Sequence, residues 1–167
     1  IVSSDAVVAE GKLKPVFAAN LSFQARGIVE TVSVKIGDSV SKGDVLARLH
    51  SSAQAAKAQK AQAALQSVEA SIKKAEANLE KARAVLAQRQ EANRRKQELV
   101  SRRVVSDQAA EEAQRDEEVA KGDLAVAASE VDVAKAQFSD ARAQYAFERA
   151  ILDQHVLVAP FDAVVVD

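Results

Sequence analysis

The chain has 167 residues, of which 48% are hydrophobic and 28% are charged, and its formal net charge is −1. This near-neutral balance gives no general attraction to nucleic acid or to an anionic membrane, and the absence of cysteine excludes disulfides, thiolate catalysis and thiolate metal sites. The apolar residues are mostly alanine and valine, with five Phe, one Tyr and no Trp, which suits narrow helix seams better than the core of a compact enzyme. No apolar run approaches the roughly 20 residues that a membrane span needs, so we expect any signal or anchor to lie outside this sequence.

The first 50 residues predict β-structure. They contain four of the five glycines and one of the two prolines, and residues 28–34 (IVETVSV) alternate apolar and polar side chains as a short half-buried strand does. We expect residues 1–15 to form a leading strand from a domain that is not fully present.

Residues 51–150 predict two long helices. This segment has no proline and a single glycine, Gly122, and it is rich in Ala, Gln, Lys, Glu and Arg, which favour helices. Apolar positions on each arm are separated alternately by four and three residues, the heptad pattern of a coiled coil. On the first arm the seam positions are Ala61, Leu65, Val68, Ile72, Ala75, Leu79, Ala82 and Leu86. On the second arm they are Ala113, Glu117, Ala120, Leu124, Ala127, Val131, Ala134, Phe138, Ala141 and Tyr145.

The two seams match each other if the chain folds back about residue 103. Residues equidistant from this point then face each other, and a large side chain meets a small one in nearly every layer, as Leu79 does with Ala127. Arg89 falls opposite Glu117, and this ion pair is predicted to help fix the register. The pattern predicts an intramolecular antiparallel coiled-coil hairpin with its tip near residues 100–105, which extends roughly 70 Å at the rise of an α-helix.

After the helices, the sequence returns to β-structure. Residues 155–167 (HVLVAPFDAVVVD) are rich in β-branched residues around Pro160. The predicted fold class is therefore α+β, with a long two-helix hairpin inserted between two β segments.

The glycine spacing of residues 23–49 (FQARGIVETVSVKIGDSVSKGDVLARL) resembles half of a lipoyl or biotinyl carrier domain. Carrier domains place a cofactor-bearing lysine shortly after this half, where this sequence has Ala53, so no cofactor is expected. A lipoyl-like domain that is split by a helical hairpin and resumed by VLVAPFDAVV is similar to the periplasmic adaptor (membrane fusion protein, HlyD-type) family of tripartite efflux pumps and type I secretion systems. The resemblance assigns residues 16–50 to the first lipoyl-like half and residues 151–167 to the start of the second.

Two features depart from the family pattern. Ala163 stands where family members usually have glycine, and we expect a slightly altered turn there. The chain also ends at Asp167, before a second lipoyl-like half is complete, and we expect the adaptor to continue beyond it.

The resemblance implies a docking motif at the hairpin tip. In the family, an arginine, a leucine four residues later and a serine seven residues after that engage the α-helical end of an outer-membrane channel, and Arg95, Leu99 and Ser106 match this spacing. Each residue also has an ordinary interpretation: Arg95 as a solvated charge, Leu99 as a tip-packing residue, and Ser106 as the N-cap of the second helix, backed by Asp107. Leu99 lies beside the seam, one turn from Arg95, and an apolar residue outside a filled seam favours a partner surface.

Other candidate sites are weaker. His50 and His155 fall at nearly the same level at the hairpin base and are weak candidates for a metal or pH-sensitive site without a third ligand. Six Lys and Arg among residues 89–103 face six Asp and Glu among residues 107–118, which argues against nucleic-acid binding. No catalytic triad, phosphate loop or carboxylate pair is recognisable, so we predict no enzyme activity.

These expectations combine into an adaptor subunit that passes substrate along without transforming it. The resemblance implies an outer-membrane channel and an inner-membrane transporter of RND, ABC or MFS type as partners, self-assembly in a hexameric ring, and a periplasmic location with an anchor outside this sequence. Two alternatives stay open: a generic coiled-coil scaffold whose β end is an unrelated domain, and a lipoyl or biotinyl carrier domain.

Overall fold

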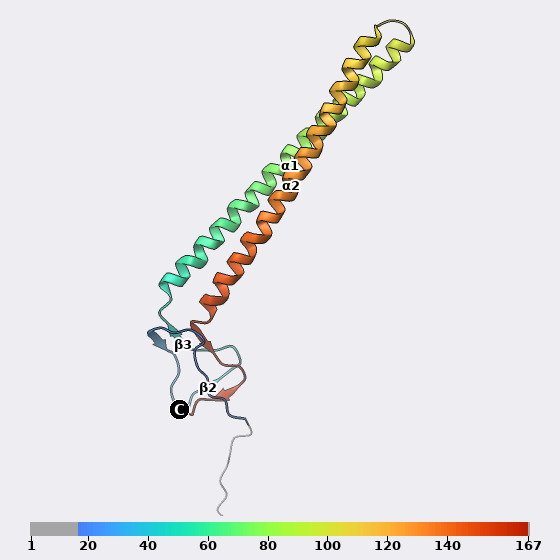
Figure 1. Ribbon diagram of the computed structural model, residues 1–167. Coiled ribbons are helices and arrows are strands. Elements are labelled where there is room, and N and C mark those ends of the chain that lie inside the picture. The colour runs from blue at the N-terminus through green and yellow to red at the C-terminus, as the bar shows by residue number, and fades with distance from the viewer. Residues whose placement is uncertain (1–16, 167) are drawn as a thin grey trace, which may run out of the picture.

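The computed structural model describes residues 17–166, so the predicted leading strand at residues 1–15 lies outside the described range. Two long antiparallel helices run side by side and project from a small β unit at their base (Figure 1). Helix α1 spans Ser52–Ser101 and helix α2 spans Asp107–Asp153, and at the rise of an α-helix each is roughly 70 to 75 Å long. The predicted α+β fold with an antiparallel hairpin is confirmed. Within residues 17–166, no helix is both long enough and apolar enough to cross a membrane.

The helices meet along the predicted heptad seams. Every seam position predicted on the two arms is buried or half-buried. The fully buried helix residues are seven alanines and Val131, so the helices approach closely and the core between them is thin. The hairpin is therefore stabilised by many small layers along its length rather than by one large core.

The middle of the seam has the predicted register. Ala75, Val131 and Ala134 form a buried cluster, against which Ile72 and Leu79 pack. Ile72 with Ala134, and Ala75 with Val131, are the pairs that lie equidistant from residue 103. The numbering rule derived from the sequence therefore describes the observed packing in these layers.

The predicted ion pair between Arg89 and Glu117 requires a correction. Arg89 Nη1 instead donates to Asp116 Oδ2 at 2.8 Å, and the Arg89 side chain is 49% exposed. A guanidinium is large and costly to desolvate inside the narrow seam, so it reaches around the flank of the seam to the exposed carboxylate. The half-buried Glu117 pairs with Asn93 and Lys121.

Five short strands form the base: β1 (Val29–Val32), β2 (Ser39–Val40), β3 (Val45–Leu49), β4 (Val156–Val158) and β5 (Ala163–Val164). One sheet has the order β1-β3-β4 and the other pairs β2 with β5, and all pairings are antiparallel. Each sheet thus joins strands from before and after the hairpin. That these strands are two halves of a lipoyl-like domain stays a prediction.

The pairing of β3 with β4 holds the two feet of the hairpin together. Strand β3 leads into α1, and β4 follows α2. Arg48 is paired with Val156, and the N–H of Leu49 donates to the carbonyl of His155 at 2.9 Å. Because α1 begins and α2 ends at adjacent paired strands, the base ends of the two helices are fixed relative to each other.

Two glycine turns shape the first β segment. Gly37 and Gly43 both have φ +95°, a conformation that side chains with a Cβ rarely adopt. Each is followed by an aspartate whose carboxylate accepts a backbone N–H three residues earlier, at 2.8 Å, as is common in tight turns. Ala163, which replaces the glycine usual in the family, is the first residue of β5.

Candidate functional site

The far end of the hairpin is closed by a Schellman-type cap on α1. The N–H of Val104 donates to the carbonyl of Leu99 at 3.0 Å, and the N–H of Arg103 donates to the carbonyl of Val100 at 2.8 Å, the paired bonds of this motif. Arg103 has φ +57°, the left-handed conformation that glycine usually supplies at this position. The chain therefore reverses at the residue about which the two seams predicted it to fold.

Ser106 is the N-cap residue of α2 by its backbone but not by its side chain. Its backbone is extended, with φ −75° and ψ 156°, and its carbonyl accepts the N–H of Ala109 at 3.1 Å. Its side chain forms no cap hydrogen bond, so the predicted position is confirmed and a capping bond from the hydroxyl is absent. Asp107 lies in the first turn, where a negative charge is favourable. The exposed Ser106 hydroxyl is thus available to a partner.

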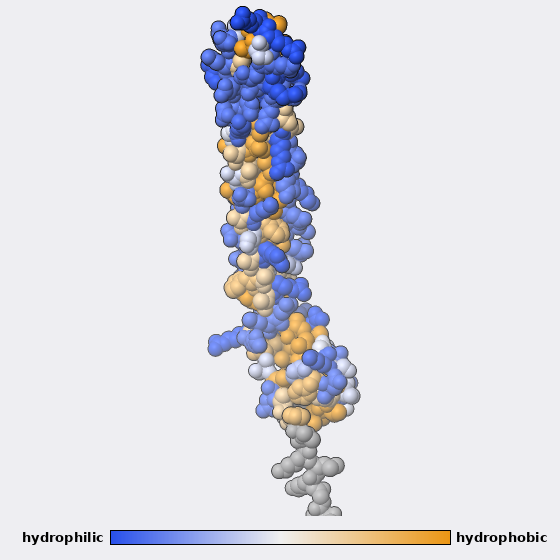
Figure 2. Space-filling model, turned by 90° about the vertical axis from the view of Figure 1, so that its right-hand side faces the viewer, coloured by the Kyte–Doolittle hydropathy of each residue, from blue (hydrophilic) through white to orange (hydrophobic). Residues whose placement is uncertain are grey.

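Leu99 is partly exposed at the end of a hydrophilic region. It is 36% exposed, and Val104 is 65% exposed. Figure 2 shows the far end of the hairpin as largely hydrophilic with a small hydrophobic spot at its extremity. Schellman motifs commonly bring these two positions into apolar contact, so Leu99 has a structural reason to be apolar and still presents a third of its surface to solvent.

The two neighbouring arginines before Leu99 are held differently. Arg94 donates from Nε and Nη2 to the two carboxylate oxygens of Glu91 at 3.1 and 2.7 Å, and this bond lowers the pKa of the Glu91 carboxyl below its ordinary value. Arg95 Nη1 lies 3.8 Å from Glu91, beyond hydrogen-bond distance. Arg95 therefore keeps more of its donors free than Arg94 does.

The three residues of the predicted motif lie at one end of the hairpin. Arg95 and Leu99 lie one helical turn apart near the end of α1, and Ser106 begins α2. No hydrogen bond or ion pair joins any two of them within residues 17–166. They are three separate exposed side chains, whose role in docking stays a prediction.

A polar layer crosses the seam below the tip. Glu117 is only 16% exposed; its Oε2 accepts from Asn93 Nδ2 at 2.7 Å and its Oε1 lies 3.0 Å from Lys121 Nζ. The hydrogen bonds from Asn93 and Lys121 lower the pKa of Glu117, and those to Glu118 and Glu117 raise the pKa of Lys121. Because Asn93 lies on α1 and Glu117 on α2, this bond can fix the register that the Arg89 pair was expected to fix.

The two histidines lie near each other in the fold but their rings are separately engaged. His50 Nε2 lies 2.8 Å from Ser52 Oγ, and His155 Nδ1 lies 2.9 Å from the carbonyl oxygen of Ile151. Across residues 17–166, no group of three or more His, Cys, Asp or Glu side chains is arranged to hold a metal ion. The weak metal candidate therefore gains no support.

Sequence reasoning missed the residue that shapes the tip. Arg103 holds the left-handed position of the cap, yet RRVV contains no glycine or asparagine to mark it. It also missed the bond between Arg94 and Glu91, although their spacing of three residues on a helix is a usable signal. Both features bear on how Arg95 and Leu99 are presented.

No family model and no curated protein sequence gives a match to this chain. Solved structures do match it. MacA from Actinobacillus actinomycetemcomitans aligns with a TM-score of 0.54 and 24% identity, over 86% of this chain and 40% of MacA. The periplasmic adaptor protein EmrA aligns with a TM-score of 0.38 and 15% identity, over 87% of this chain and 64% of EmrA.

ZneB from Cupriavidus metallidurans aligns with a TM-score of 0.36 and 24% identity, over 84% of this chain and 48% of ZneB. The chain thus spans less than two thirds of the length of each of these three proteins. At the level of the fold, the match to MacA agrees with the resemblance inferred from the sequence. This chain shares the fold of the part of MacA that it covers.

Proposed function

We propose that the chain is the hairpin-bearing part of a periplasmic adaptor subunit, which bridges an inner-membrane transporter and an outer-membrane channel for efflux or secretion. The observation that carries this proposal is the partly exposed Leu99 at the far end of a long two-helix rod. Such a rod, held at its base by paired strands, is suited to end-on docking. The shared fold with MacA supports the same function.

The tip offers three kinds of contact to a channel. Leu99 supplies a small apolar surface, the Arg95 guanidinium supplies directional hydrogen bonds to carboxylates or helix-end carbonyls, and the Ser106 hydroxyl supplies a short polar contact. Each contact is modest by itself. If several copies present their tips together, the contacts add by multivalency, and a weak single-tip affinity is enough to hold the assembly.

The remaining parts of the proposal follow from the family resemblance. The adaptor assembles with copies of itself, in a ring of six, and is anchored at the inner membrane by a segment outside this chain. It contacts a transporter of RND, ABC or MFS type, and substrate passes through the assembly unchanged. The proposed function requires no cofactor and no catalytic residue.

The test is to replace tip residues and to measure export in cells together with cross-linking to the outer-membrane channel. Leu99→Asp places a charge where an apolar contact is proposed, and Arg95→Asp reverses the charge of a guanidinium that is only loosely paired with Glu91. Both variants should lose export and cross-linking, while helicity, melting temperature and binding to the inner-membrane transporter stay near wild type. The result would locate the defect in docking rather than in folding.

Arg94→Asp is the matched control. It makes the same charge change one residue away, at a side chain that is engaged with Glu91. This exposed pair contributes little to stability, so the control should fold and export nearly as wild type does. Export that is normal in Leu99→Asp, or equally impaired in Arg94→Asp and Arg95→Asp, would contradict the docking role of the motif.

A further inference from the structure

A second row of apolar side chains runs along α2, outside the seam with α1. Val119, Val126, Val133 and Phe147 are between 56% and 64% exposed. The three valines follow one another at intervals of seven residues, and Phe147 continues the row after Asp140. Seven residues are about two helical turns, so these residues lie along one line of the helix surface. We refer to the four apolar residues as the valine row.

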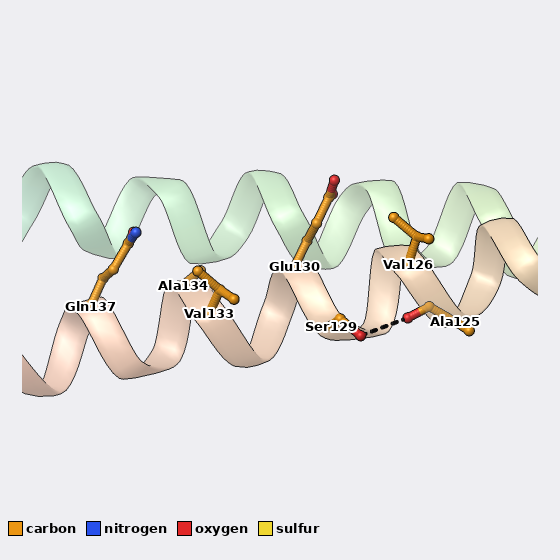
Figure 3. Close-up of a pocket in the computed structure, with 7 residues that line it drawn as sticks. All are labelled: Ala125, Val126, Ser129, Glu130, Val133, Ala134 and Gln137. Carbon is orange, nitrogen blue, oxygen red and sulfur yellow. Dashed lines mark hydrogen bonds between the residues drawn. The ribbon is translucent and has the colours of Figure 1, made fainter.

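Two members of the valine row, Val126 and Val133, line an open groove on α2. Figure 3 shows Val126 and Val133 standing out from this helix, with Glu130 between them. The lining residues all belong to α2: Ala125, Val126, Ser129, Glu130, Val133, Ala134 and Gln137. A heptad row of exposed valines beside a groove is the surface of a helix seam without its second helix.

The outward face of α1 has the complementary shape. Ala63, Ala70, Ala77 and Ala84 are exposed and also follow one another at intervals of seven residues. We refer to them as the alanine row. If two hairpins stand side by side at equal height, Val126 of one falls level with the gap between Ala77 and Ala84 of the other. Valines would then enter the spaces between alanines, as knobs enter holes in a coiled coil.

The charges beside the two rows are also complementary. Lys74 and Lys81 flank the alanine row, whereas Asp123 and Glu130 flank the valine row. None of these four side chains forms an ion pair within residues 17–166. When the two hairpins stand at equal height, Asp123 of one copy lies level with residue 83 of the other, two residues from Lys81. Glu130 likewise lies level with residue 76, two residues from Lys74. Two residues are about 3 Å along a helix axis, which these side chains can span.

We propose that the valine row of one chain binds the alanine row of a second copy, with the two hairpins pointing in the same direction at the same height. The α1 helix of the second copy then runs antiparallel to α2 of the first, as α1 does within one chain. The contact joins different faces of the two copies, so it can repeat from copy to copy. It rests on the self-assembly included in the proposed function and assigns that self-assembly to two surfaces.

Cysteine cross-linking tests this arrangement directly, because the chain contains no cysteine of its own. Ser129 and Ala77 are exposed and fall level with each other at equal height. They lie on the outer sides of the two helices, away from the seam, so they cannot form a disulfide within one hairpin. The double variant Ser129→Cys with Ala77→Cys should form disulfide-linked dimers and higher multimers on mild oxidation.

The matched control moves one cysteine three heptads along the same face. Ser129→Cys with Ala56→Cys displaces the two thiols by about 30 Å along the axis, and it should give few cross-links at the same concentration. Equal cross-linking of the two variants, or none in either, would overturn the proposal. Since this test uses purified protein without a channel, its failure is distinguishable from failure of the docking role of Leu99.

Substitutions without cysteine test the proposed contact between copies independently. Val126→Asp should weaken self-association by about tenfold or more in sedimentation equilibrium, because a charge would enter the apolar contact. Val104→Asp makes the same change at an equally exposed valine outside the row, and it should associate as wild type does. Asp123→Lys should also weaken association, and adding Lys81→Asp should restore much of it. No recovery in this double variant would contradict the proposed register.

Discussion

The backbone N–H of Val104 donates to the carbonyl of Leu99 across the end of α1, and Arg103 lies between them in the left-handed conformation. Arg103 is the one residue other than glycine with positive φ among residues 17–166. For a residue with a Cβ this conformation costs about 1 kcal/mol or more relative to the right-handed one. The tip that presents Leu99 is therefore built at the expense of local backbone strain.

Replacing Arg103 by glycine should stabilise the hairpin. Glycine adopts φ +57° without steric penalty, and the change should raise the free energy of unfolding by up to about 1 kcal/mol, because part of the gain is offset by the greater freedom of glycine in the unfolded chain. Thermal melting followed by circular dichroism measures this. Arg102→Gly is the control, since Arg102 has φ −88° and gains nothing from glycine. A melting temperature of Arg103→Gly below that of wild type would contradict this account of the cap.

The register of the seam can be tested with a pair of substitutions. Leu79 packs against the cluster around Ala75 and Val131, so Leu79→Ala should lower the free energy of unfolding by about 2 kcal/mol. Ala127 is buried and lies as far from residue 103 along the chain as Leu79 does. Adding Ala127→Leu should therefore recover much of the lost stability. Urea unfolding of the single and double variants measures both. If the double variant is no more stable than Leu79→Ala, these residues do not share a layer.

Glu117 should make the stability of the hairpin depend on acid pH. Its pKa is lowered in the folded chain, mainly by the hydrogen bond from Asn93 and then by the one from Lys121. The folded state therefore binds a proton at the Glu117 carboxylate more weakly than the unfolded state does. The stabilisation is present above the ordinary carboxyl pKa of about 4.5 and is lost as the pH falls through the lower folded value.

Glu117→Gln should therefore melt below wild type at neutral pH, and the difference should narrow as the pH is lowered below this ordinary value. Melting curves of both proteins over a series of pH values measure the difference. Glu76→Gln is the control, because Glu76 is exposed and forms no ion pair within the described part of the chain. A constant difference between Glu117→Gln and wild type down to pH 3 would contradict the role of the carboxylate charge.

The helical part of the fold was predictable because it repeats. Each layer follows from the alternation of four and three residues, and the pairing of large with small residues indicated both the antiparallel arrangement and the reversal at residue 103. The partner of Arg89 was not predictable by this rule, since heptad positions describe Cβ directions and not the reach of a flexible guanidinium. Whether Arg89 pairs with Asp116 or with Glu117 depends on solvation at the flank of the seam, and the spacing of the residues carries no information about that solvation.

The tip residues stay a prediction, and the sequence did not indicate how their side chains are held. The family resemblance implied Arg95, Leu99 and Ser106, yet it could not indicate that Arg94 binds Glu91 while Arg95 stays more than 3.5 Å away, because adjacent arginines look alike in a sequence. The valine row was visible as valines seven residues apart. It was overlooked because the seam with α1 already accounts for the helix, and a second row becomes meaningful only when the first is seen to be filled.

The last prediction separates the two roles that Ser106 can have. An N-cap serine whose hydroxyl bonds to the helix typically contributes about 1 kcal/mol, which alanine removes. Here the hydroxyl forms no cap hydrogen bond, so the free energy of unfolding of Ser106→Ala should lie within about 0.5 kcal/mol of the wild-type value. If the hydroxyl contacts the channel, the same variant should nevertheless lower cross-linking to the channel.

Ser101→Ala is the control at the same tip: the Ser101 hydroxyl donates to the Glu98 carbonyl at 2.7 Å, and its loss should leave docking unchanged. A clear drop in stability of Ser106→Ala with unimpaired cross-linking would show instead that the serine acts as a cap and not as a docking residue.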